Sequence, residues 1–102
     1  MDFRYFGKNM ELTNSLKEYT TDKLMKFFVG HNVKPLKTTE VELGKDSQHH
    51  HSGNIFRAEI MVHLSGKTLR VEQTAETVLA AFDLCIPKLK IMLEKHKDKN
   101  NK

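Results

Sequence analysis

Apolar and polar residues alternate most regularly between residues 56 and 64. Phe56, Ala58, Ile60, Val62 and Leu64 alternate with Arg57, Glu59, Met61 and His63. This period of two predicts a β-strand with one buried face. Ser65-Gly66 follows as a two-residue turn, because glycine takes positive φ without strain, and Leu69 and Val71 belong to the next strand. The pattern therefore predicts an antiparallel hairpin.

Two shorter segments also have the character of strands. Phe3-Arg4-Tyr5-Phe6 is rich in aromatic residues and alternates weakly, and we expect Gly7 to end it. Residues 38–43 place Thr39, Val41 and Leu43 on one face and polar side chains on the other. The second segment is therefore predicted to be a half-buried strand.

Two stretches carry apolar residues at helical spacing. The first is predicted over about residues 14–28, with Thr13 as its N-cap, Gly30 as its stop and a loop through Asn32 and Pro35. Its apolar side contains Leu16, Tyr19, Leu24, Phe27 and Phe28. The second starts near Glu76, and its stripe contains Val78, Phe82, Cys85, Ile86, Leu89 and Leu93. Pro87 interrupts it, so we expect a kink or a break there.

The order strand, helix, three strands, helix predicts an α+β fold in two layers, a four-stranded sheet with both helices on one face. The 102 residues, 38% of them hydrophobic, form one domain, 1–102, with enough apolar side chains for a core. The sequence shows no repeat, no membrane-length apolar run and no signal-peptide pattern at its start. We therefore expect a cytoplasmic protein.

Charge is concentrated at the C-terminal end. Residues 1–87 contain eleven basic and eleven acidic side chains, whereas residues 88–102 contain six lysines against Glu94 and Asp98. The whole formal charge of +4 therefore belongs to the last helix and a basic tail over about 96–102. Localised positive charge is typical of a surface that binds polyanions.

The lysines fall into rows on the predicted helices. Lys88, Lys95 and Lys99 share one side of the last helix within about 40°, and Lys90 and Lys97 form a second row. Lys8, Lys17, Lys23 and Lys26 lie on or before the first helix. If both helices cover one face of the sheet, their lysines border a shared surface suited to a phosphate backbone. The alternative is a solvated surface whose lysines also offset the helix dipole.

Other candidate chemistry is weak. His49-His50-His51 has no partner ligands at zinc spacing, so no functional metal site is expected. The single cysteine, Cys85, lies on an apolar stripe and is expected to be a buried structural thiol, which argues against a pair with His63. An Asp83–His96 pair is likewise not favoured, and no phosphate loop, nucleophile elbow or His-Glu-x-x-His motif is present. We therefore predict a protein that is not an enzyme and uses no cofactor.

Several segments together resemble the family of ribosome hibernation-promoting factors and ribosome-associated inhibitor Y proteins, also known as sigma-54 modulation proteins. The segments are Gly-Lys-Asn-Met-Glu-Leu-Thr at 7–13, Leu-Lys-Glu-Tyr at 16–19, Asp-Lys-Leu-Met-Lys at 22–26, Ala-Ala-Phe-Asp at 80–83, Lys88-Leu89, Leu93, and Lys-His-Lys-Asp-Lys at 95–99. They occur in register over nearly the whole chain. The sequence departs from the family pattern at Thr77-Val78-Leu79, Pro87 and Ile91. Ile91 occupies a position where an arginine is common in the family. We expect Lys90 to supply the positive charge of that arginine.

The resemblance implies a β-α-β-β-β-α domain, related in shape to double-stranded RNA-binding domains, that resembles the short form of the family. It implies binding to the small (30S) subunit and the 70S ribosome, contact with 16S rRNA, and inhibition of translation by occupying the channel for mRNA and tRNA. We expect no DNA or membrane partner, and a monomer off the ribosome. The expected rRNA contacts are Lys8, Lys17, Lys23, Lys26, Lys88, Lys90, Lys95, Lys97 and Lys99.

A second hypothesis, independent of the family, is a protein-interaction module. In that case the helix interrupted by Pro87 contacts a protein partner, and the lysines serve only solubility. Loss or survival of the partner after RNA digestion distinguishes the two hypotheses.

Overall fold

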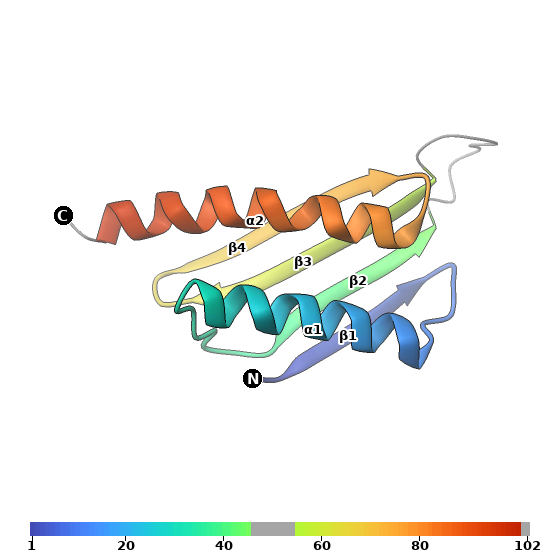
Figure 1. Ribbon diagram of the computed structural model, residues 1–102, viewed down its shortest axis with the longest axis horizontal. Helices are drawn as coiled ribbons and strands as arrows, with labels where there is room; N and C mark the ends of the chain where they lie inside the picture. The colour runs from blue at the N-terminus through green and yellow to red at the C-terminus, as the bar shows by residue number, and fades with distance from the viewer. Residues whose placement is uncertain (46–54, 101–102) are drawn as a thin grey trace.

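The computed structural model describes residues 1–45 and 55–100, with side chains described up to residue 97. The elements in chain order are β1 (Phe3–Lys8), α1 (Asn14–Gly30), β2 (Thr39–Lys45), β3 (Phe56–Leu64), β4 (Lys67–Ala75) and α2 (Val78–Asn100). The predicted α+β class and element order are confirmed. Figure 1 shows both helices in front of the same face of the sheet, running side by side in the same direction.

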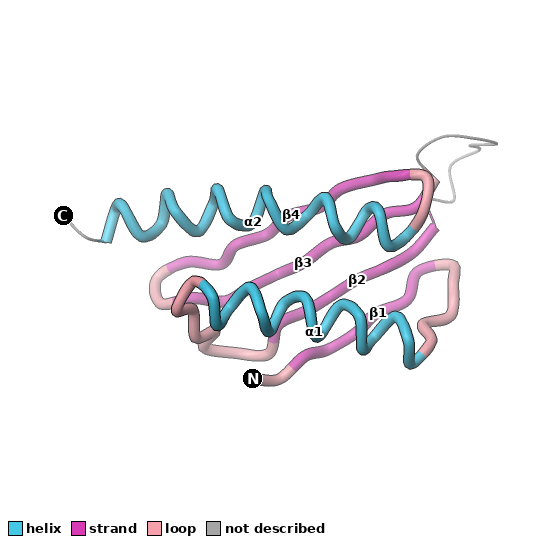
Figure 2. Tube along the Cα trace, viewed as in Figure 1, coloured by secondary structure: helices cyan, strands magenta, loops and turns pink. Residues whose placement is uncertain are grey.

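The sheet has the order β1-β2-β3-β4. β1 and β2 are parallel because α1 carries the chain back between them, whereas the other neighbours are antiparallel (Figure 2). Leu64 pairs with Lys67 across the predicted turn, and Gly66 has a φ of 78°. The hairpin and its glycine are therefore confirmed.

The core lies between the sheet and the two helices. Alternate strand residues point into it, including Val41, Ile60 and Val71, and the helices contribute fully buried rings from Phe28 and Phe82. Within the described residues no element covers the opposite face of the sheet, which carries mainly charged side chains. The two-layer arrangement thus gives the molecule one helical face and one open sheet face.

Gly7 does not end β1. It lies within the strand and pairs with Leu43, and the strand continues to Lys8. A Cβ atom at Gly7 would lie 2.5 Å from the carbonyl oxygen of Met10, so the residue is needed for a close backbone approach. The expectation of a strand end at Gly7 was therefore wrong, because packing of the chain that leads to α1 determines this glycine.

Both ends of α1 are capped, but not both as expected. Thr13 is the N-cap, its hydroxyl accepting from the Leu16 N–H at 3.1 Å, which confirms the prediction. Gly30, expected as the stop, is instead the last helical residue. Asn32 takes the left-handed conformation with φ 54°, and the Val33 N–H donates to the Phe28 carbonyl at 2.8 Å. This is a Schellman-type end, which asparagine tolerates.

Pro87 does not break α2. The helix runs from Val78 to Asn100 with Pro87 inside it, so the expected break is wrong (Figure 2). Proline removes one helical hydrogen bond, here to the carbonyl of Asp83. Pro87 is on the exposed side, while Leu89 and Leu93 beyond it are buried. Packing of this later segment on the sheet therefore holds the helix together across the proline.

Cys85 is a buried structural thiol, as predicted. Its side chain is fully buried and its Sγ lies 3.6 Å from the carbonyl oxygen of Ala58. Burial raises the pKa of the Cys85 thiol from 9.0 to about 12. His63 lies on the opposite face of β3 from Ala58, so the two residues cannot form a catalytic pair.

We expect the native Cys85 thiol to react with a disulfide reagent only as fast as the protein opens, and rapidly in denaturant. Because its pKa is higher folded than unfolded, the thiol contributes stability that is complete below about pH 9 and is lost as pH rises towards 12. Urea unfolding of Cys85→Ala and wild type across this range measures the difference. Equal pH slopes for the two proteins, or fast native labelling, would contradict this account.

Candidate nucleic-acid interface

The structure places the lysines predicted to contact rRNA on four different sides of the molecule. Asp83 and Lys97 mark the side of α2 that faces α1, because Asp83 bonds to Tyr19 of α1 and Lys97 to His31, the residue that caps α1. Lys90 is on this side too, seven residues from each of them and within about 20° in direction. Lys88 is nine residues from Lys97 and points about 180° away, and Lys95 lies near the direction of Lys88.

The lysines of α1 divide in the same way. Tyr19 and Lys23 contact Asp83, so their side of α1 faces α2. Lys26, seven residues after Tyr19, shares that side within about 20°. Lys17 is nine residues from Lys26 and therefore points about 180° away from it. Lys8 is on the open sheet face, and the side chain of Lys99 is outside the described residues.

One tie joins the middle of α1 to the first half of α2. The Tyr19 hydroxyl donates to Asp83, with its oxygen 2.9 Å from Oδ1 and 3.0 Å from Oδ2. Lys23 Nζ lies 3.8 Å from the same carboxylate, and the Tyr19 ring packs edge-on against Phe82. Sequence reasoning missed this tie, although an acidic residue directly beside Phe82 of the apolar stripe is a usable signal.

A second tie joins the far ends of the helices. The ammonium of Lys97 donates to the carbonyl oxygen of His31, the residue that caps the end of α1. A cation at this position also opposes the negative end of the α1 dipole. Lys97 was predicted as an rRNA contact, and in the structure it forms this internal hydrogen bond.

We define the inter-helix surface as the facing side chains of the two helices. Its members are Tyr19, Lys23, Lys26, Asp83, Lys90, Lys97 and also Glu94, which is eleven residues after Asp83 and within about 20° of it in direction. The two ties fix the relative position of α1 and α2 at both ends of this surface. Lys26 and Lys90 lie between the ties. The lysines are thus held on a prearranged support, although each ammonium is on a flexible stem.

The open sheet face differs in its charge pattern. Glu42, Glu59 and Glu72 form one row across β2, β3 and β4. Arg57 forms ion pairs with all three, and Arg70 with Glu59 and Glu72. Burial alone would lower the pKa of Arg57, but hydrogen bonds to Glu72 and Glu42 and the charge of Glu59 raise it. Arg57 and Arg70 are thus neutralised, so this row is less suited to a polyanion. Arg4 and Lys8 of the same face form no ion pair within the described residues.

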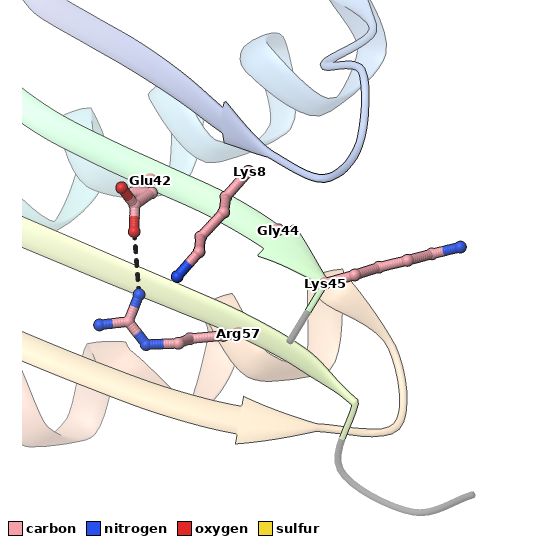
Figure 3. A pocket seen from close by; sticks show the side chains of 5 residues that line it. All are labelled: Lys8, Glu42, Gly44, Lys45 and Arg57. Carbon is pink, nitrogen blue, oxygen red and sulfur yellow. Dashed lines mark hydrogen bonds and ion pairs between the residues drawn. The ribbon is translucent and has the colours of Figure 1, made fainter. Parts of the chain in front are cut away.

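A pocket of about 260 Å³ opens at one end of this face, lined by Lys8, Glu42, Gly44, Lys45 and Arg57 (Figure 3). Lys8 points across Gly44 towards Arg57, whereas Lys45 points away. Arg57 is already paired with Glu42 at 2.9 Å. The pocket therefore presents one unpaired cation, Lys8, beside the neutral Arg57–Glu42 pair. These groups offer few contacts to a cofactor.

Other candidate features give no catalytic or metal site within the described residues. No group of three or more His, Cys, Asp or Glu side chains there could hold a metal ion, and His49–His51 lie outside that part of the chain. Phe6 is 40% exposed on the open sheet face. Among the helices described, none is both long and apolar enough to cross a membrane.

Comparison with known proteins gives consistent matches. Residues 3–101 match the family model described as sigma 54 modulation protein / S30EA ribosomal protein. A ribosome hibernation promotion factor of Lactococcus lactis subsp. cremoris (strain MG1363) is 29% identical over 106 residues, covering 98% of this chain and 51% of that protein. The chain thus spans about half the length of that relative.

Two solved structures share the fold. The N-terminal domain of Thermus thermophilus Protein Y aligns with a TM-score of 0.75 and 25% identity, covering 94% of this chain and 99% of that one. A ribosomal subunit interface protein from Coxiella burnetii aligns with a TM-score of 0.72 and 20% identity, covering 96% and 99%. The second likeness is evidence of the fold alone.

Proposed function

This chain belongs to the sigma 54 modulation protein / S30EA ribosomal protein family, and from that membership we propose that it is a ribosome hibernation factor. It binds the small ribosomal subunit, alone and in the 70S ribosome, through lysines of both helices that contact 16S rRNA. It acts without catalysis, by occupying the channel used by mRNA and tRNA. Its place of action is the cytoplasm, and off the ribosome it is a monomer of one domain, 1–102.

The observation that supports this proposal best is the contrast between the two faces. On the helical side, Lys26, Lys88, Lys90 and Lys95 form no ion pair within the described residues. On the sheet side, Arg57 and Arg70 are neutralised by a row of glutamates. Phosphate groups are attracted to unpaired cations and repelled by carboxylates. The helical side is therefore the side that faces rRNA.

Co-sedimentation with purified 30S and 70S particles tests the proposal. We expect binding whose logarithm falls linearly with the logarithm of salt concentration, with a slope of about −0.7 to −0.9 for each phosphate contacted. In cell extracts, RNA digestion should release the bound ribosomal proteins. Failure of the protein to bind either particle at low salt would refute the function.

A second candidate function rests on exposed apolar residues of α2. Leu84 and Ile91 are 48% and 50% exposed on its outer side, on either side of Pro87 in sequence. Such residues suit a protein partner. A pull-down partner that survives RNA digestion, without enrichment of rRNA, would favour this protein-interaction module over rRNA binding.

The contribution of the α2 lysines that point away from α1 to ribosome binding is tested separately. We expect Lys88→Glu, Lys95→Glu and Lys99→Glu together to weaken 30S binding by at least about tenfold, because each change replaces an attraction to phosphate by a repulsion. Filter binding or sedimentation at moderate salt measures the loss, and circular dichroism checks the fold. Unchanged binding would remove the outer side of α2 from the interface.

A further inference from the structure

β4 forms one edge of the sheet, because β3 is its only neighbour among the strands that the structure describes (Figure 1). The other edge strand, β1, is six residues long, whereas β4 is nine. The pairing of β4 with β3 runs without a bulge from Leu64–Lys67 to Phe56–Ala75, and β4 contains no proline. β4 therefore presents a long and regular edge, which is the kind of edge to which another strand adds.

The hairpin determines which backbone groups of β4 face this edge. Leu64 and Lys67 flank a two-residue turn, so they form a hydrogen-bonded pair, and such pairs recur at every second residue of the strand. The odd-numbered residues of β4 therefore bond to β3. The even-numbered residues direct their N–H and C=O groups outward and their side chains to the open sheet face. These residues are Thr68, Arg70, Glu72 and Thr74.

The charges of β4 match those of a second copy of the same strand. When two copies pair antiparallel about a two-fold axis, their outward-facing residues meet one another. Registers that place Arg70 opposite Arg70, or Glu72 opposite Glu72, are destabilised by like charges. In the register centred on Val71, Arg70 of each copy lies opposite Glu72 of the other. This register is the one that places opposite charges across from each other twice.

The side chains of β4 are also accessible to a second copy. Arg70 is 59% exposed and Glu72 is 51% exposed, although within the chain Arg70 bonds to Glu59 and Glu72 to Arg57. Arg70 of a second copy would add one more cation at the end of the glutamate row on β2, β3 and β4. On the other face of the strand, Val71 meets Val71 of the second copy and loses its remaining 7% of exposure to water.

We propose that the β4 edge joins two copies of this chain into a dimer, with one continuous sheet built from the four strands of each copy. The dimer forms when the protein is concentrated, and the dilute protein is the monomer proposed above. Lys88 and Lys95 point away from α1, on the side of α2 where β4 is the edge, so pairing brings these cations closer together and their repulsion keeps the dimer weak. The inference goes beyond the proposed function, because it concerns the free protein and requires no ribosome.

Sedimentation equilibrium from about 10 µM to about 1 mM protein, the range of weak association, tests the dimer. We expect the average mass to rise with concentration towards twice that of one chain. Arg70→Glu and Glu72→Arg should each weaken dimerisation by at least about tenfold, because each change places like charges opposite each other at two points of the interface. A mixture of the two variants should dimerise again, because each mixed pair restores both attractions.

Arg4→Glu is the matched control for Arg70→Glu. Arg4 is an exposed arginine on β1, the opposite edge strand, and its replacement changes the net charge by the same amount. It should leave dimerisation unchanged within about twofold. Circular dichroism establishes that all the variants fold. The mixing step does not depend on the ion pairs lost within each chain, because those losses are the same in the mixture and in each variant alone.

Amide hydrogen exchange locates the interface. The N–H groups of Arg70 and Glu72 should exchange more slowly as the wild-type protein is concentrated, whereas that of Tyr5 in β1 should not change. A wild-type protein that stays monomeric at the highest concentration would overturn the inference. A mixture of Arg70→Glu and Glu72→Arg that associates no more than either variant alone would also overturn it. Neither result would alter ribosome binding, which is measured separately.

Discussion

Replacing Lys23, Lys26 and Lys90 together by glutamate is expected to lower affinity for the 30S subunit by at least about 100-fold at moderate salt. The three ammonium groups lie on one surface between tied helices, so an approaching phosphate backbone meets all of them. Each reversal removes one attraction and adds one repulsion. In Lys23→Glu the new carboxylate also faces Asp83, which raises the negative charge of the same surface.

The control must change net charge by the same amount elsewhere. Lys34, Lys37 and Lys67 are exposed, lie outside the helices and are not among the proposed contacts. Their triple replacement by glutamate should cost less than about tenfold, the part of the effect that is due to long-range charge alone. Circular dichroism and urea unfolding of both triple variants establish that they fold. Equal losses of affinity in the two triple variants would mean that binding to rRNA depends only on the net charge of the protein.

The fold was predictable from sequence because its strands and helices have strong periodicities. Residues 56–64 alternate except at Met61, and the inward Ala58, Ile60 and Val62 are the ones that the structure buries. The errors fall at Gly7, Gly30 and Pro87, where local propensity suggested an end. At Gly7 and Pro87 tertiary packing decides instead, whereas the end of α1 after Gly30 is determined locally by the left-handed Asn32. Gly7 approaches the backbone of Met10, and Leu89 and Leu93 anchor α2 beyond its proline.

The arrangement of the lysines was only partly predictable. Spacing alone shows that Lys88 and Lys90 point to different sides of a helix. It does not show which side meets the other helix, because that depends on how α1 and α2 are placed on the sheet. The Tyr19–Asp83 hydrogen bonds supply this information. They favour the row of Lys90, rather than that of Lys88, as the partner of the α1 lysines.

Lys97 shows how one charge serves the fold as well as a surface. Lys97, near the end of α2, is one of the residues expected to contact rRNA, and in the structure its ammonium also bonds to the end of α1. This bond holds the two helices together at their far ends, beyond the Tyr19–Asp83 tie. An internal role of this kind is compatible with a nearby phosphate, because an ammonium group has three donors.

Phe82→Ala is expected to cause the largest loss of stability of any change considered, about 3–5 kcal/mol. The ring is fully buried between α2 and the sheet and packs edge-on against Tyr19, with ring centroids 6.3 Å apart. Removing it leaves a cavity and also loosens the support of the Tyr19–Asp83 tie. A small domain has about 5–15 kcal/mol in total, so much of its stability would be lost.

Thermal and urea unfolding followed by circular dichroism measure the effect. The midpoint temperature should fall by more than about 12 °C. Phe6→Ala is the matched control, since it removes an equally large ring from the open sheet face, where the ring is 40% exposed, and should cost less than about 1 kcal/mol. Equal losses of stability in the two phenylalanine variants would contradict the conclusion that the buried Phe82 ring stabilises the core.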